Sequence, residues 1–281
     1  MKRIAVLLCV VMCLGLLVSC GAAQCTVEGC EGEAVEDAVF EKQFCADHLA
    51  KKYCAIESCD EVAVEDTAYE EGYCKKHLAN KKAYDVSKMA YENITKAYKI
   101  TEQYGDDIYD AWYIGIFNTE DLYDQGGTYL ASELNLTEEE LAQGVSYALI
   151  QAFGMNWDET DQATKEEYME ASGIHFLTVG LMADIKTFCV ECVNGAYEVT
   201  GKNDEALLAL EEAKTLMKQL SEEYADYEHY PNLKGYYTAT SSFFNFCVNP
   251  TGSFDQLRTT INDYRNEARD YISDLDYIFE E

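Results

Sequence analysis

Proline and basic residues are both scarce in this chain of 281 residues. Only two prolines occur, so most of the sequence is free to form uninterrupted helices. Lysine and arginine number 21 against 52 aspartate and glutamate residues, and the formal net charge is -31. Because such an acidic surface repels phosphate backbones, the composition argues against a nucleic-acid partner.

The sequence also lacks the most recognisable catalytic motifs. It contains no H-E-x-x-H motif, no G-x-S-x-G nucleophile elbow and no phosphate-binding glycine loop. Its acidic runs, such as 138–140 and 222–223, do not have the ligand spacing of an EF-hand loop. These absences remove the common signatures of hydrolases, nucleotide-binding enzymes and calcium sensors, while an enzyme that uses other residues is not excluded.

The start of the chain has the pattern of an export signal. Lys2 and Arg3 provide a positive start, and residues 4–18 form an apolar stretch of signal-peptide length. A transmembrane helix needs roughly 20 apolar residues, so this stretch is too short to span a bilayer comfortably. The pattern predicts a signal peptide over residues 1–19.

The apolar stretch ends at Leu17-Val18-Ser19-Cys20, which resembles the lipobox of bacterial lipoproteins. The resemblance implies that residues 1–19 are removed and that Cys20 receives acyl groups, with 20–24 as the lipidated N-terminus. Several acyl chains hold a protein stably on a membrane, whereas a single chain holds it only marginally. We therefore expect a lipid-anchored protein on the extracytoplasmic face of the cell membrane. The alternatives are an ordinary secretory signal and an uncleaved anchor.

A repeat of cysteine and histidine follows, with a period of 29 residues and the pattern C-x4-C-x14-C-x2-H. Its eight cysteines and histidines are Cys25, Cys30, Cys45, His48, Cys54, Cys59, Cys74 and His77. Three thiolates and one imidazole form a closed, tetrahedral structural zinc site. The spacing predicts two structural zinc ions, one in a module over 25–53 and one in a module over 54–82. Because each module is too small to fold by burying apolar area alone, metal binding would supply most of its folding free energy.

Each module is predicted to contain a small hairpin followed by a helix. Residues 34–40 and 63–69 include short alternating segments typical of strands. The third cysteine and the histidine lie three residues apart, which places them on one face of a first helical turn. This arrangement resembles a treble-clef zinc finger, although four residues separate the first two cysteines where the usual knuckle has two.

Disulfide bonds are the main alternative to zinc, because exported proteins meet an oxidising or poorly reducing environment. The six cysteines could form three bridges, but each copy holds an odd number of cysteines and both histidines are then left without a role. A catalytic zinc would need an open coordination position, which four protein ligands do not leave. Zinc storage or sensing through the same ligands is a further alternative.

Residues 83–281 are expected to form an acidic helical bundle, because apolar residues recur there with helical spacing. The fold class predicted for the chain is mainly α, with this bundle preceded by two zinc-stabilised hairpin-plus-helix modules. Thr137 and Glu140 suggest a capping box, Gly105 is a position where the first helix could bend or break, and Leu207 is expected on a buried stripe. The predicted helices span about 86–117, 137–149, 165–199, 204–227, 233–247 and 257–278.

Tyrosine is abundant, with 22 residues, and suggests a binding face. The candidates are Tyr109, Trp112, Tyr113, Tyr236 and Tyr237. Tyrosine and tryptophan provide rigid amphipathic area for peptides or sugars, and a mixture of acids and aromatic rings could contact a cationic partner. The competing interpretation is that these rings pack the bundle while their hydroxyl groups reach water.

Three further cysteines and one histidine are interpreted as core residues. Cys189 and Cys192 have the C-x2-C spacing of thiol oxidoreductases, but no thioredoxin-like βαβ pattern surrounds them. We expect them to be buried, with a bridge to Cys247 as an open alternative. His175 lies within an apolar run and is expected to pack there.

The sequence thus predicts a lipid-anchored zinc-binding protein whose helical region interacts with an envelope protein or glycan, or acts as a scaffold. Fold alone does not identify that partner. A zinc storage or sensing protein is the first alternative, and a cell-envelope hydrolase that uses carboxylates of the bundle is the second.

Overall fold

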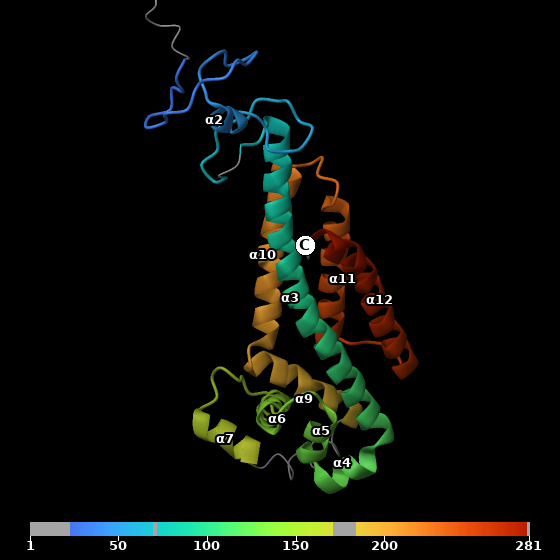
Figure 1. The fold of residues 1–281 in the computed structure, drawn as a ribbon. Coiled ribbons are helices and arrows are strands. Elements are labelled where there is room, and N and C mark those ends of the chain that lie inside the picture. The colour runs from blue at the N-terminus through green and yellow to red at the C-terminus, as the bar shows by residue number, and fades with distance from the viewer. Residues whose placement is uncertain (1–22, 70–71, 171–183, 280–281) are drawn as a thin grey trace, which may run out of the picture. The chain divides into compact units, whose positions relative to one another are not determined.

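The computed structural model describes three stretches of the chain, 23–69, 72–170 and 184–279 (Figure 1). The predicted signal peptide, the predicted lipidation residue Cys20 and the predicted packing residue His175 lie outside the described residues. Residue contacts divide the chain into two compact units, Met1–Lys82 and Ala83–Glu281.

The described residues form helices and isolated β-bridges but no sheet, which confirms the prediction of a mainly α fold. No helix within these stretches combines the length and the apolar character needed to cross a membrane. In chain order the helices are α2 (Ala46–Ala50), α3 (Lys75–Phe117), α4 (Thr119–Gln125), α5 (Gly127–Glu133), α6 (Glu138–Ala152), α7 (Gln162–Glu170), α9 (Ile185–Val199), α10 (Lys202–Glu223), α11 (Tyr230–Val248) and α12 (Phe254–Phe279).

The two modules of the first unit repeat the same backbone hydrogen bonds at an offset of 29 residues. The Cys25 amide donates to the Gly32 carbonyl at 3.0 Å, and the Cys54 amide donates to the Glu61 carbonyl at 2.9 Å. Other matched pairs are Thr26–Gln43 with Ala55–Gly72, Val35–Phe44 with Val64–Tyr73, and Ala34–Ala23 with Ala63–Lys52. The duplicated sequence therefore encodes a duplicated backbone.

Isolated β-bridges are found in both modules in place of the predicted hairpins. The isolated bridges are Gln24 with Glu33, Tyr53 with Val62, and Val64 with Tyr73. No ladder extends from them because the chain turns inside the predicted segments. Asp37 accepts hydrogen bonds from the amides of Val39 and Phe40, both at 2.8 Å, and Asp66 accepts one from Ala68 at 2.9 Å.

The same two aspartates also bind the last residues of their modules. The Tyr53 hydroxyl donates to both carboxylate oxygens of Asp37, at 2.9 and 2.8 Å. In the second module, Lys82 Nζ lies 2.5 Å from Asp66 Oδ2. Tyr53 and Lys82 occupy equivalent positions of the repeat. Both modules therefore keep the contact with the aspartate, but the donor is a neutral hydroxyl in the first module and a cation in the second.

In the second unit, α10, α11 and α12 lie alongside α3, and the shorter helices α4 to α7 gather near the end of α3 (Figure 1). Hydrogen bonds join α3 to α12 through Asp106 and Arg265 at 2.7 Å, and to α9 through Tyr104 and Asn194 at 2.8 Å. Eight residues that recur along α3 at helical spacing are buried, namely Ala90, Ile94, Ala97, Thr101, Ile108, Ala111, Trp112 and Gly115. Periodicity along this helix was therefore sufficient to predict its buried face.

Two details of the helical prediction were wrong. Gly105 does not break α3, and its missing side chain makes room for Phe243, because an added Cβ would lie 2.6 Å from the Phe243 ring. Leu207 is 46% exposed, since the buried face of α10 is carried by neighbours such as Ala206 and Leu210. Small residues such as Gly105 and Ala206 thus determine which helix faces pack together. The positions of the large apolar residues alone do not identify those faces.

The other predicted helices agree with the structure in type and differ in extent. The capping box at the start of α6 is present, with the Glu140 amide donating to Thr137 Oγ1 at 3.2 Å and Glu140 accepting from the Thr137 amide at 2.8 Å. The helix predicted over 165–199 corresponds to α7 and α9, between which 171–183 lies outside the described residues. The short helices α4 and α5 were not predicted.

Helices α6 and α9 cross at very short distance through two glycines. A Cβ added to Gly144 would lie 2.7 Å from the backbone nitrogen of Ala196, and one added to Gly195 would lie 2.8 Å from the carbonyl oxygen of Gly144. Only glycine permits two helical backbones to approach so closely.

Candidate metal centres

The first Cys3His group is formed by the turn at the start of the first module and by α2. Cys45 immediately precedes α2, and His48 lies within it. The sulfur atoms of Cys25 and Cys45 each lie 3.3 Å from Nδ1 of His48, and Cys30 Sγ lies 3.7 Å from Cys45 Sγ. All four ligand atoms lie within 4.8 Å of one another.

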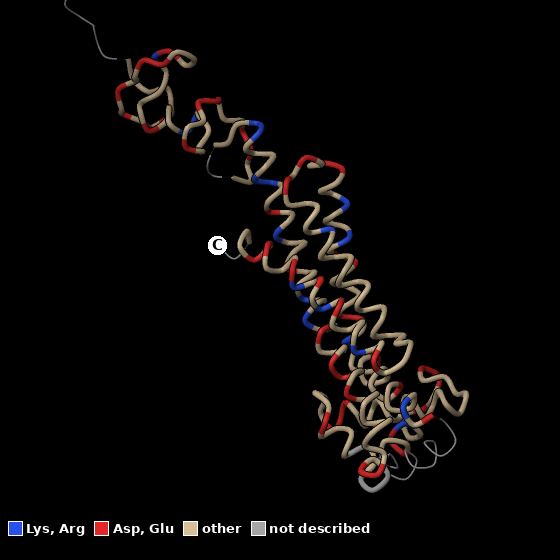
Figure 2. The backbone as a smooth tube through the Cα atoms, turned by 90° about the vertical axis from the view of Figure 1, so that its right-hand side faces the viewer, with Lys and Arg blue, Asp and Glu red and all other residues tan. Residues whose placement is uncertain are grey.

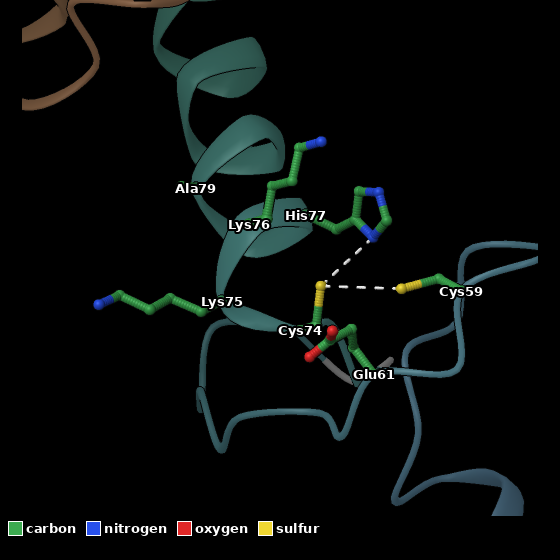
Figure 3. A pocket seen from close by; sticks show the side chains of 7 residues that line it. All are labelled: Cys59, Glu61, Cys74, Lys75, Lys76, His77 and Ala79. Atoms are coloured by element: carbon green, nitrogen blue, oxygen red, sulfur yellow. Dashed lines mark hydrogen bonds between the residues drawn. The ribbon is translucent and has the colours of Figure 1, made fainter.

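The second group has the same construction at the start of α3. The sulfur atoms of Cys54 and Cys74 lie 3.1 and 3.4 Å from Nδ1 of His77, and the sulfur atoms of Cys59 and Cys74 are 3.9 Å apart. Figure 3 shows Cys59, Cys74 and His77 converging, with Cys59 on a loop and His77 on the first turn of α3. The eight residues predicted from the repeat are thus brought together as two groups of four.

These separations fit a tetrahedral zinc ion. With Zn–S bonds of about 2.3 Å and Zn–N bonds of about 2.0 Å, a tetrahedron has sulfur–sulfur edges of about 3.8 Å and sulfur–nitrogen edges of about 3.5 Å. The sulfur–sulfur separations of 3.7 and 3.9 Å, and the sulfur–nitrogen separations of 3.1 to 3.4 Å, lie close to these edges. A disulfide would require sulfur atoms about 2.0 Å apart. None of the six cysteines of the modules forms a disulfide bond.

No family model, curated protein or solved structure matches this chain. The assignment of the two centres therefore rests on their own ligand geometry and on the internal duplication. Both lines agree, because the repeat predicts the same eight residues that the fold brings together.

A residue in the left-handed region precedes the second cysteine of each module. Gly29 has a φ of 77°, and Ser58 has a φ of 67° at the equivalent position. The Cys30 amide donates to the Val27 carbonyl at 3.0 Å and closes this turn, and the equivalent bond of the second module measures 3.1 Å. The four-residue spacing between the first two ligands is thus accommodated by a tight turn, which takes the place of the usual two-residue knuckle.

Replacing Ser58 by glycine is expected to stabilise the second module by about 0.5–1 kcal/mol, because glycine adopts a positive φ without the steric cost that serine bears. Zinc affinity of the second centre should rise about two- to fivefold, measured by competition with a chromophoric chelator. The matched reverse change, Gly29→Ser, is expected to weaken the first centre by a similar factor. Weaker zinc binding by Ser58→Gly would contradict this account of the turn.

Hydrogen bonding favours the thiolate form of the first cysteine in each module. Burial raises the pKa of Cys25, but hydrogen bonds from the backbone at Cys45 and Val27 and from His48 outweigh burial and lower the pKa to about 6. The same balance lowers the pKa of Cys54 to about 6. Because the thiolate is the form that binds metal, each centre presents a sulfur ready for coordination near neutral pH.

The five aromatic candidates do not form one surface. Tyr236 has no exposed area and Trp112 is only 4% exposed, so the prediction of a binding face was wrong for these two. They lie on the inner faces of α11 and α3, where they join the core. Tyr113 is exposed, and Tyr109 and Tyr237 are partly buried.

The remaining cysteines behave as core residues, as expected. Cys189, Cys192 and Cys247 are free and fully buried, so the alternative of a bridge between them is not realised. Burial raises the pKa of Cys189 to about 12 and raises the pKa of the other two as well. Thiols held in the neutral form are poor nucleophiles, which argues against a redox role.

A buried carboxylate, Asp107, was missed by the sequence analysis. It has no exposed area and accepts hydrogen bonds from the Tyr197 hydroxyl at 2.8 Å and from the Asn135 amide at 3.0 Å, while its pKa is raised by burial. Nothing in the run Asp106-Asp107 distinguishes the buried acid from its partly exposed neighbour. Because its oxygens are occupied by donors from α9 and the segment before α6, Asp107 holds these elements to α3.

Proposed function

We propose that this chain is a lipid-anchored extracytoplasmic protein in which two structural zinc ions hold the N-terminal modules, and an acidic helical region interacts with a partner in the cell envelope. The observation that carries the zinc assignment is the convergence of four ligand atoms within 4.8 Å in each module. Four protein ligands leave no open coordination position, so the ions would serve folding and not catalysis. The residues Leu17-Val18-Ser19-Cys20 support the lipid anchor.

A second candidate, zinc storage or sensing, is favoured by an open hollow beside the second centre (Figure 3). The hollow is lined by Cys59, Glu61, Cys74, Lys75, Lys76, His77 and Ala79. A competing ligand could approach two of the zinc-binding sulfur atoms from this side. In this role the second centre would exchange its ion faster than the first.

Native mass spectrometry of the purified chain, without added metal, tests the proposal directly. We expect two zinc ions per chain, lost on treatment with a strong chelator, and an N-terminal acyl mass on Cys20. The Cys20→Ser variant should leave the membrane fraction and lose the acyl mass while it keeps both zinc ions.

Two outcomes would contradict the proposal. A zinc-free chain with a mass lower by about 2 Da per cysteine pair would mean disulfide bonds in place of zinc. A wild-type chain without acyl mass at Cys20 would remove the lipid anchor but leave the zinc assignment intact. Rapid loss of one ion to a weak chelator, with the second ion retained, would favour storage or sensing.

A further inference from the structure

An exposed aromatic patch lies where α3 ends and α12 begins. We call this group the aromatic patch, and its members are Tyr109, Tyr113, Ile116, Phe117 and Phe254. The Phe254 ring lies 5.2 Å from the ring of Tyr109, 5.9 Å from that of Tyr113 and 5.5 Å from that of Phe117. Four rings from two helices therefore form one connected cluster.

Part of this cluster faces solvent. Tyr113 is 41% exposed, Ile116 is 40% exposed and Phe117 is 58% exposed. Other large rings of the second unit, such as Tyr104 and Tyr236, are fully buried. Contiguous exposed apolar area of this kind is typical of interaction sites.

The segment of the chain that carries most of the aromatic patch is acidic in sequence. Residues 100–164 contain 14 aspartate and glutamate residues and no lysine or arginine. Asp106 and Asp110 precede Tyr113 at helical spacing on α3, and Asp255 directly follows Phe254. Among the described residues of the tube in Figure 2, acidic positions are more frequent than basic ones.

Two arginines of α12 neutralise part of this charge. Arg265 lies 2.7 Å from Asp106, and Arg258 lies 3.9 Å from Asp255. Among the residues that the structure describes, Asp110 forms no ion pair. The negative charge beside the rings is therefore only partly balanced from within the chain.

The state of Asp110 reflects this imbalance. Its pKa is raised to about 6, first by burial and then by the neighbouring carboxylates of Asp106, Asp107 and Glu133. A cation placed beside Asp110 would relieve that repulsion. The site thus combines apolar rings with an electrostatic preference for positive charge.

We propose that the aromatic patch is a docking surface for a cationic peptide segment that combines lysine or arginine with large apolar side chains. The inference rests on the proposed interaction role of the helical region. Apolar side chains of the segment pack on the rings, while its cations stack on Tyr113 and Phe117 or pair with Asp110. The net charge of -31 disfavours an anionic lipid surface or a second copy of this chain as the occupant.

Fluorescence anisotropy with the purified chain and a labelled amphipathic peptide of lysine, leucine and tryptophan tests the proposal. Binding should weaken with added salt, and the double variant Tyr113→Ala/Phe117→Ala should bind about tenfold more weakly than the wild type. Asp110→Asn should also weaken binding and reduce its salt dependence. Tyr277→Ala is the matched control, because Tyr277 is an 82% exposed tyrosine of α12 outside the aromatic patch.

Circular dichroism of each variant first establishes that the helices are retained. Equal affinity of the wild type and the double variant, or equal losses in the double variant and in Tyr277→Ala, would overturn the proposal. Binding of a neutral oligosaccharide in place of the peptide would overturn it as well, in favour of a glycan partner. Zinc and acyl content, measured on the same samples, depend on residues 20–82, so failure of peptide binding is distinguishable from failure of the metal and lipid assignments.

Discussion

Replacing His77 by alanine is expected to lower the zinc content of the chain from two ions to one. His77 Nδ1 lies 3.1 and 3.4 Å from the sulfur atoms of Cys54 and Cys74, so its loss removes one of four ligands. Loss of an outer-shell partner alone typically weakens metal binding roughly 10- to 100-fold, and loss of a ligand should weaken it more. Native mass spectrometry measures the stoichiometry, and proteolysis reports unfolding of the second module.

His229→Ala is the matched control for this change. His229 lies immediately before α11, near Glu228 and outside both Cys3His groups. The control should keep two ions and the protease resistance of the wild type. Two ions in His77→Ala would show that His77 is not a ligand.

Replacing Gly144 by alanine is expected to destabilise the helical region by about 3 kcal/mol. Alanine gains about 1 kcal/mol over glycine from helix propensity, so the sign depends on the space available. The added Cβ would overlap the Cys192 carbonyl oxygen and lie 2.7 Å from the Ala196 nitrogen. Because these are backbone atoms, α6 and α9 would have to separate, and the lost packing outweighs the gain.

The neighbouring change Gln143→Ala provides the comparison, since it also introduces alanine in α6 but at a partly exposed position. Its free energy of unfolding should stay within about 0.5 kcal/mol of the wild type. Urea denaturation followed by circular dichroism measures both variants. A Gly144→Ala protein as stable as Gln143→Ala would show that the two helices are not closely packed at this crossing.

The eight candidate metal ligands could be predicted from sequence because each group of four lies within one short module and the module occurs twice. Each ligand is one of two residue types with few competing roles, and the 29-residue period separates them from the cysteines of the core. The hairpins could not be predicted correctly, since the side chains of Asp37 and Asp66 compete with strand pairing for the backbone amides. The alternation of apolar and polar residues, from which the hairpins were predicted, does not indicate whether a side chain will bind these amides.

Exposure of aromatic residues was harder to predict than helix positions. Tyr113 and Tyr236 are the same residue type on amphipathic helices, yet one is exposed and the other is fully buried. The difference depends on which helices pack together, and Phe254 reaches Tyr113 from the distant α12. Periodicity defines a helix face, whereas only the tertiary arrangement determines what covers it.

Tyr53 links the two modules, so order in one module supports order in the other. Its backbone bridges to Val62 of the second module, while its hydroxyl donates to Asp37 of the first. An ion that orders one module would also restrain Tyr53, on which the other module closes, so a second ion would bind at a lower entropic cost. Loss of one ion is therefore expected to weaken binding of the other ion without abolishing it.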